Sequence, residues 1–151
     1  MRPSSTLVHV LPLVGILFAP AGASADVSPT APPSLMREFF RALHDHNIYY
    51  LEHYLTTADF HIFEGNISFS KAGWFKYVRS KSTEVQGVWN LTDFVVSVDE
   101  KSAHVYYDDR AVFTNTSSGQ QTRHHWIESA YMVMDDERLK IKFISSTSVN
   151  L

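Results

Sequence analysis

The feature that most constrains the fold is a change of hydrophobic period after Gly87. From there, apolar residues alternate with polar ones through long segments at about 85–98, 102–114, 120–134 and 138–149. Short turns rich in Asp, Glu, Ser and Gly separate these segments. Alternation with a period of two is typical of half-buried strands, and short connections make consecutive strands antiparallel neighbours. The sequence therefore predicts a four-stranded antiparallel meander.

Apolar residues at helical spacing precede this meander. Ser34 is the predicted N-cap of a first helix, a second helical stretch follows Asn47, and Ser70 starts a third. Before Ser70, the short aromatic run Phe60–Glu64 is closed by Gly65 and is typical of a strand. Helices followed by a run of strands indicate the α+β class, and long antiparallel strands twist and curl. We therefore expect a cone, in which a strongly curved antiparallel sheet and three N-terminal helices enclose a pocket.

The N-terminal segment has the pattern of an export signal. An apolar core at Leu7–Phe18 leads into a small-x-small sequence ending at Ala25, which predicts a signal peptide over residues 1–25. An anchor that is never cleaved is the alternative. Residues 26–33 contain three prolines and no apolar periodicity, which predicts a disordered tether. We therefore expect one domain over residues 34–151 of a secreted or periplasmic protein.

Composition excludes several kinds of function. Cysteine is absent, which removes thiol nucleophiles, thiolate metal ligands and disulfides, so packing of 10 Phe, 7 Tyr and 3 Trp has to stabilise the domain. The net charge is −3 with no basic run, so no nucleic-acid partner is expected. No later segment is long and apolar enough to span a bilayer, and no membrane partner is expected after signal cleavage. No cofactor is expected.

Four pieces of the chain resemble the NTF2-like superfamily, in its SnoaL-like and calcium/calmodulin-kinase-association-like branch. They are Tyr54-Leu55 with Asp59–Gly65, Ser70–Trp74, Trp126–Ala130 and Phe143–Val149. The resemblance covers nearly all of residues 34 to 150 and implies an NTF2-like cone. It implies much less about activity, because the superfamily contains isomerases, dehydratases, cyclases, epoxide hydrolases and assembly domains.

The resemblance also implies a site inside the cone. The glutamate that matches Glu128 in the kinase-association branch points inward, and a period of two turns Trp126 the same way. Counting back across the turn at Gly119 places Arg110 where that branch has an inward arginine, with Asp108 on the same face. The expected pocket is mainly apolar and holds a buried Asp108–Arg110–Glu128 cluster. The predicted ligand-binding residues are Tyr50, Tyr54, His61, Tyr106, Arg110, Trp126, Glu128, Phe143 and Ser145.

This cluster has three interpretations. It is an internal ion pair that fixes strand register, a clamp in which Arg110 binds a ligand carboxylate, or an acid–base centre with Asp108, Arg110 and Glu128 as catalytic candidates. A shift of register by one residue would turn these residues to the outer face.

The enzymes of the superfamily match the sequence only in part. An aspartate base of the ketosteroid-isomerase type is absent after the second helix, where the chain reads His61-Ile62-Phe63-Glu64. The two carboxylates and one arginine have an epoxide-hydrolase-like composition, but the Asp-x-Arg order on one strand is reversed. Of a dehydratase-like histidine pair, His61 and His125 are candidates, and His125 is expected to face outward. Elsewhere the histidines lack the spacing of a metal site, so no metal is expected.

Residues of the meander that face away from the pocket also matter. Val105, Tyr107, Ile127, Tyr131 and Val133 are expected to form an apolar stripe on the outer face of the sheet, which predicts a homodimer. The function expected from the sequence is binding of a small molecule by an exported domain. An acid–base enzyme of the isomerase, dehydratase or epoxide-hydrolase-like type and an oligomeric assembly domain are the alternatives.

Overall fold

A computed structural model describes residues 26–81 and 83–150, and the predicted signal peptide lies outside these residues. The described chain forms helices followed by strands, as predicted for the α+β class. The helical elements are α1 (Ala31–His44), α2 (Ile48–Tyr50), the π-helical turn η1 (Leu51–Leu55) and α3 (Lys71–Lys81). The strands are β1 (Thr56–Glu64), β2 (Ile67–Ser70), β3 (Val85–Val98), β4 (Ser102–Asn115), β5 (Gln121–Asp135) and β6 (Arg138–Ser148).

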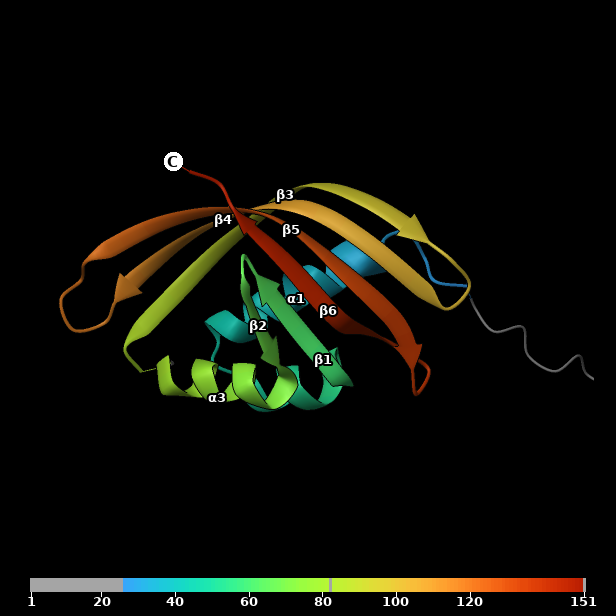
Figure 1. Ribbon diagram of the computed structural model, residues 1–151, viewed down its shortest axis with the longest axis horizontal. Helices are drawn as coiled ribbons and strands as arrows, with labels where there is room; N and C mark the ends of the chain where they lie inside the picture. The colour runs from blue at the N-terminus through green and yellow to red at the C-terminus, as the bar shows by residue number, and fades with distance from the viewer. Residues whose placement is uncertain (1–25, 82, 151) are drawn as a thin grey trace, which may run out of the picture.

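The strands form one six-stranded sheet in the order β2-β1-β6-β5-β4-β3. The predicted meander is confirmed, because β3, β4, β5 and β6 pair antiparallel with their neighbours in sequence. Strand β1 joins the other side of β6 in parallel, and the short strand β2, which was not predicted, pairs with β1 at the edge. The long strands arch over α1 and α3, so the concave face of the sheet covers the helices (Figure 1).

The first helix begins earlier than predicted. It starts at Ala31 rather than Ser34, and Pro32 and Pro33 occupy its first turn, where a missing backbone N–H breaks no helical hydrogen bond. Val27 is buried in the core at 7% exposure. The structure differs from the predicted disordered tether over residues 26–33, because α1 begins within this segment and Val27 and Pro32 are buried against the domain.

Aromatic side chains fill the space between sheet and helices. Phe39 of α1 stacks on Trp74 of α3 with ring centroids 5.6 Å apart, and Phe60 of β1 meets the same tryptophan edge-on at 5.7 Å. Phe39, Phe60 and Phe75 are almost fully buried. Burial of a large apolar side chain stabilises a fold by about 1.5–3 kcal/mol, so these rings stabilise a domain that has no disulfide.

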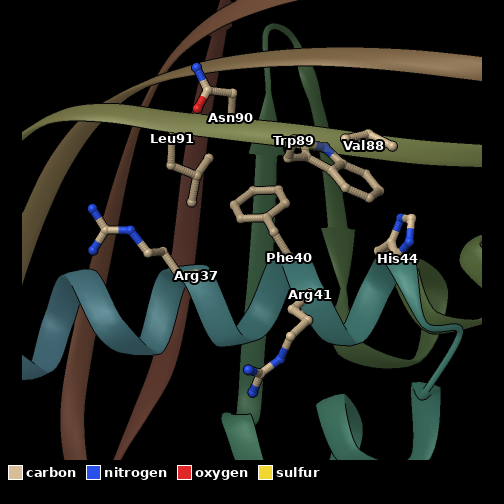
Figure 2. A pocket seen from close by; sticks show the side chains of 8 residues that line it. All are labelled: Arg37, Phe40, Arg41, His44, Val88, Trp89, Asn90 and Leu91. Atoms are coloured by element: carbon tan, nitrogen blue, oxygen red, sulfur yellow. The ribbon is translucent and has the colours of Figure 1, made fainter.

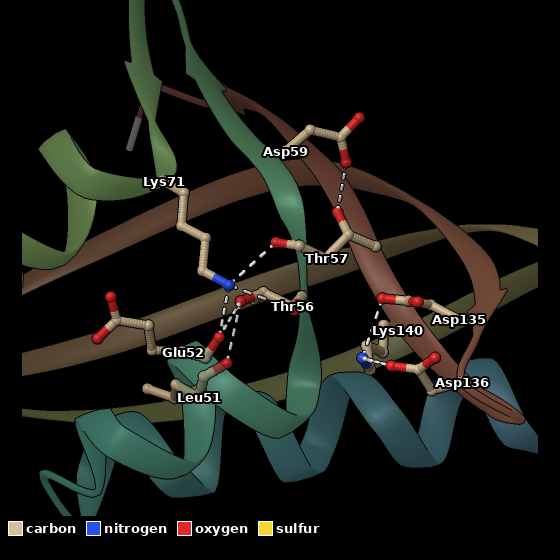
Figure 3. A network of polar contacts seen from close by, with 9 residues as sticks. All are labelled: Leu51, Glu52, Thr56, Thr57, Asp59, Lys71, Asp135, Asp136 and Lys140. Atoms are coloured by element: carbon tan, nitrogen blue, oxygen red, sulfur yellow. Dashed lines mark hydrogen bonds and ion pairs between the residues drawn. The ribbon is translucent and has the colours of Figure 1, made fainter.

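Two lysine side chains form hydrogen bonds that connect neighbouring elements (Figure 3). Lys71, the first residue of α3, donates through Nζ to the carbonyl oxygens of Glu52 at 2.5 Å and Thr57 at 3.0 Å. These contacts join the start of α3 to η1 and β1, and burial lowers the pKa of the Lys71 ammonium group. Lys140 of β6 similarly donates to Asp135 at 2.9 Å, across the last turn. No helix in the described part of the chain has the length and apolar character needed to cross a membrane.

Candidate functional site

A cavity of about 740 Å³ lies between the concave face of the sheet and the helices α1 and α3. Aromatic rings from both layers dominate its wall. They are Phe39, Phe40, Trp74, Tyr77, Trp89, Phe113 and Trp126. A volume of this size is within the range of small-molecule sites, which are mostly apolar with few polar groups.

Two acidic side chains from neighbouring strands are buried polar groups in the lining of this cavity. Tyr107 of β4 pairs with Glu128 of β5, and Asp109 pairs with Trp126. Paired residues share a face of the sheet, so Asp109 and Glu128 are diagonal neighbours that both line the cavity. Their side chains are deeply enclosed, at 1% exposure for Asp109 and 7% for Glu128.

The carboxyl group of Glu128 has hydrogen-bonding partners. The Tyr107 hydroxyl, itself buried, donates to Glu128 Oε2 at 2.7 Å, and the Ser146 hydroxyl also donates to this carboxylate. Burial raises the pKa of Glu128, and the two hydroxyl donors offset part of that rise. Glu128 is therefore held in a fixed position on the wall of the cavity.

The carboxyl group of Asp109, unlike that of Glu128, lacks hydrogen-bond partners among the described residues. Its buried Oδ1 has no hydrogen-bond partner among the described residues. Burial, with smaller contributions from the negative charges of Glu128 and Asp108, raises the pKa of Asp109 to about 8. Asp109 is thus mostly protonated at neutral pH, and it presents a carboxylic acid without a partner in an aromatic cavity.

The predicted Asp108–Arg110–Glu128 cluster does not form. Asp108 and Arg110 lie on the outer face, where Arg110 Nε donates to Asp108 Oδ1 at 3.0 Å. The loop between β4 and β5 sets this register: Thr114 pairs with Gln121, so even-numbered residues of β5 lie opposite odd-numbered residues of β4. The predicted register across Gly119 differs from the observed one by one residue. A shift of one residue turns every side chain of a strand to the opposite face of the sheet.

Most of the other residues that were predicted to line the pocket point away from the cavity. Trp126 and Glu128 line the cavity as expected, but Tyr106 and Tyr54 are exposed at the surface. Tyr50 donates its hydroxyl hydrogen to Glu38 Oε1 at 2.5 Å, and it lies outside the cavity.

A β-bulge turns the predicted residues of the last strand outward. The register between β5 and β6 shifts where Tyr131 pairs with Phe143 and Met132 pairs with Ile141. The bulge inserts one residue, so Phe143 and Ser145 face outward with their partner Tyr131 and with His61 of β1. Ile144 and Ser146 line the cavity in their place.

The sequence contains a signal for the correct face of β4. Ala103, Val105, Tyr107 and Ala111 alternate with more polar residues, and this apolar set includes Asp109 at the same period. The apolar set faces the core, as strand alternation requires. Reading this strand by itself therefore identifies Asp109 and Tyr107 as inward residues.

Comparison with known proteins gives matches in structure alone. No family model matches the chain, and a search of curated proteins finds no related sequence. A candidate dehydratase of the NTF2-like family from Streptomyces avermitilis superposes with a TM-score of 0.72 at 14% identity, over 82% of this chain and 100% of that one. A candidate calcium/calmodulin-dependent kinase II association domain from Exiguobacterium sibiricum gives 0.70 at 18% identity, over 86% and 99%.

A ketosteroid isomerase-like protein from Erwinia carotovora atroseptica gives a TM-score of 0.66 at 12% identity, over 82% of this chain and 97% of that one. The molecule thus belongs to the class of α+β proteins in which a curved, unclosed sheet wraps an internal cavity. Its fold is the NTF2-like fold, as the resemblance in sequence implied.

Proposed function

We propose that the protein binds a small, mainly apolar and uncharged molecule in the cavity, and that Asp109 donates a hydrogen bond to an oxygen of that molecule. The observation that carries this proposal is the buried, unpartnered Oδ1 of Asp109. A buried polar atom without a partner is costly, and a bound carbonyl or ether oxygen would remove that cost.

The lining of the cavity favours a neutral ligand. No arginine is among the lining residues of the described chain, and Lys81 is the cation found there. A clamp on a ligand carboxylate by Arg110 is therefore not supported, because Arg110 lies on the opposite face. Aromatic rings from α1, α3 and the sheet offer stacking surfaces for a planar apolar body.

Acid–base catalysis is the second candidate, and the contrast between the two carboxyl groups favours it. Glu128 is anchored by Tyr107, whereas Asp109 is unpartnered with a pKa of about 8, near neutrality. A group with such a pKa both gives and accepts protons efficiently. Two of the similar structures have the names of enzymes, a ketosteroid isomerase-like protein and a candidate dehydratase, which is in keeping with this second candidate. An epoxide-hydrolase-like reaction loses its basis, since Asp108 and Arg110 are outside the cavity.

The binding proposal is tested with a matched pair of probes, acetonaphthone and ethylnaphthalene, which share an aromatic body but differ in a carbonyl. Quenching of tryptophan fluorescence reports occupancy, because Trp74, Trp89 and Trp126 line the cavity. We expect the ketone to bind about tenfold more tightly, and Asp109→Leu to abolish this preference. Asp108→Leu, on the outer face, is the control that leaves the preference intact. Equal affinity for both probes in the unmodified protein would reject a hydrogen bond from Asp109.

The catalytic candidate requires a separate measurement. Acetonaphthone in deuterium oxide exchanges the hydrogens next to its carbonyl when a base removes them, and proton NMR follows that loss. Exchange that is faster with the protein and is abolished in Asp109→Asn would support catalysis. Binding without any such acceleration would restrict the cavity to ligand binding for this class of ketone.

We further propose export and self-association. Export rests on the pattern of residues 1–25, and N-terminal sequencing of the protein purified from its host would test cleavage after Ala25.

Self-association concerns the outer face of the sheet. Val105 and Tyr107, which were expected in the outer apolar stripe, are buried in the core. Ile127, Tyr131 and Val133 alternate with the core residues Ala130 and Met132 and lie on the outer face.

On that outer face Tyr131 stacks on Phe143 at 5.6 Å, and Phe143 meets the half-exposed Phe63. An aromatic patch of this kind supports a homodimer formed through the sheet. Sedimentation should give a dimer for the unmodified protein and a monomer for Tyr131→Lys. A large closed oligomer would favour an assembly domain.

A further inference from the structure

A second hollow lies outside the main cavity, between α1 and the edge strand β3 (Figure 2). It has a volume of about 350 Å³. Phe40, Trp89 and Leu91 form its apolar floor, and Arg37, Arg41 and His44 follow one another along the helix beside it. We call this hollow the α1–β3 groove.

The arginines of the groove lack acidic partners. Neither Arg37 nor Arg41 makes an ion pair within 4.0 Å in the part of the chain that the structure describes. Glu38, the acid between them in sequence, instead accepts the hydroxyl hydrogen of Tyr50. In a chain of net charge −3, this groove therefore carries local positive charge that no neighbouring carboxylate neutralises at short range.

Arg37 is held so that its hydrogen-bonding edge stays available. Its guanidinium lies over the ring of Phe94, with Cζ 4.4 Å from the ring centroid. Stacking uses the face of a guanidinium, whereas its N–H groups point outward in the plane and match a carboxylate. In Figure 2, Arg37 extends beside Leu91, while the tip of Arg41 turns away from β3. Arg37 is thus the principal cation and Arg41 adds charge one helical turn away.

His44 fixes the other end of the groove. Its Nδ1 lies 2.8 Å from the carbonyl oxygen of Gly87, so that nitrogen donates to the carbonyl and the ring links α1 to β3. Gly87 has no room for a side chain, because an added Cβ would lie 2.3 Å from the ring of Trp89. The walls of the groove are therefore fixed in relation to each other.

We propose that the α1–β3 groove is a second binding site, for a small organic anion with an apolar body. Its carboxylate would meet the N–H groups of Arg37, and its apolar body would lie on Trp89 and Leu91. The lining of the groove contains two arginines and no Asp or Glu among the described residues, whereas the lining of the main cavity contains Asp109 and Glu128 and no arginine. Phe40 and Trp89, with centroids 5.5 Å apart, line both hollows and form the partition between them.

Fluorine NMR with para-trifluoromethyl benzoate tests this site, with the uncharged para-trifluoromethyl benzamide as the matched probe. At about 50 mM salt, where screening is moderate, we expect the benzoate to bind about tenfold more tightly than the amide. Arg37→Gln should weaken benzoate binding about tenfold and Arg41→Gln about threefold. Arg123→Gln removes the same charge from an exposed position on β5 and should leave the affinity unchanged.

Two further variants locate the probe and control for folding. Arg37→Lys keeps the charge and should retain part of the affinity, which separates loss of the ligand contact from loss of the fold. Asp109→Leu should leave benzoate binding unchanged, because the partition separates it from the groove. Equal affinity for benzoate and benzamide would overturn the proposal, as would equal effects of Arg37→Gln and Arg123→Gln. A benzoate signal that responds to Asp109→Leu instead of Arg37→Gln would assign the anion to the main cavity and overturn it too.

Discussion

Asp108 and Asp109 are neighbours on one strand, yet they occupy opposite environments. Asp108 faces outward, where His125 Nε2 lies 2.6 Å from its Oδ2 and Arg110 contacts its Oδ1. The hydrogen bond from His125, followed by that from Arg110, lowers the pKa of Asp108. Asp109 faces the cavity, where burial raises its pKa to about 8. The same residue type is therefore a paired carboxylate on the outer face and a carboxylic acid on the inner face.

The pleat of the strand causes this difference. Successive residues point to opposite faces, so one step along β4 exchanges a polar, partly solvated surface for an aromatic interior. Burial disfavours the charged form, whereas a cationic or hydrogen-bonding partner favours it. The chemistry of this site therefore depends on strand register more than on which residue types are present.

The largest effect is expected from Asp109→Asn. The unfolded aspartate ionises near 3.8, whereas the folded one keeps its proton to about 8, so unfolding releases a proton between these values. Stability contributed by this group is complete below about pH 4 and falls as pH rises toward about 8. At about pH 7 the difference amounts to roughly 4 kcal/mol, and Asn, which does not ionise, should recover about 2–4 kcal/mol of it.

Urea unfolding at about pH 5 and about pH 8 measures this prediction directly. The unmodified protein should lose stability between these conditions, and Asp109→Asn should be more stable at the higher pH with a flatter dependence. A variant that is less stable than the parent at both pH values would show that Asp109 is not a buried acid of raised pKa.

The second effect, on the same face, is that of Tyr107→Phe. This change removes the donor that contacts Glu128 at 2.7 Å and leaves a buried carboxylate with one partner fewer. We expect a loss of about 1–3 kcal/mol in the free energy of unfolding. Because Tyr107 lowers the pKa of Glu128, its removal should raise that pKa and make stability fall more steeply as pH rises above the ordinary value. A loss that is identical at low and high pH would instead indicate a packing defect.

The sequence predicted the sheet well and the site poorly, for the same physical reason. The meander was readable because β3 to β6 each repeat the alternation over many residues, and a boundary error of one residue does not change the element. The short strand β2 was missed because its four residues, mostly exposed, carry little alternation.

The face of the sheet to which a side chain points is mispredicted after a register error of one residue, whereas the strand itself is still predicted correctly. An error of one residue in the register across the loop before Gln121 placed Asp108, rather than Asp109, on the inner face. The bulge beside Phe143 then exchanged Ile144 and Ser146 for Phe143 and Ser145, and neither Gly nor Pro marks that bulge in the sequence. Trp126 and Glu128 do line the cavity, because their inward face follows from the resemblance itself, whereas the faces of residues on β4 and β6 depend on the register relative to β5.

The third effect, on the outer face, is that of Asp108→Asn. Its folded pKa is lowered, so the stability that it contributes is present above its ordinary value of 3.8 and disappears as pH falls through the folded pKa. At about pH 7 we expect a loss of about 1 kcal/mol, opposite in sign to Asp109→Asn. Thermal unfolding across this range should show the two variants diverging at neutral pH and Asp108→Asn converging on the parent in acid.

The smallest effect is expected from Arg110→Gln, the residue that the sequence placed inside the cone. Arg110 is 61% exposed and pairs with Asp108 on the outer face, where such an ion pair contributes at most about 0.5 kcal/mol. Ketone binding in the cavity should be unchanged, because no part of this side chain lines it. Equilibrium unfolding and the fluorescence titration measure both quantities on one sample. A strong loss of ketone affinity in Arg110→Gln, together with unchanged ketone affinity in Asp109→Leu, would mean that β4 presents the opposite face to the cavity in solution. An unchanged titration with Arg110→Gln leaves the one-residue difference between Asp108 and Asp109 as the determinant of the site.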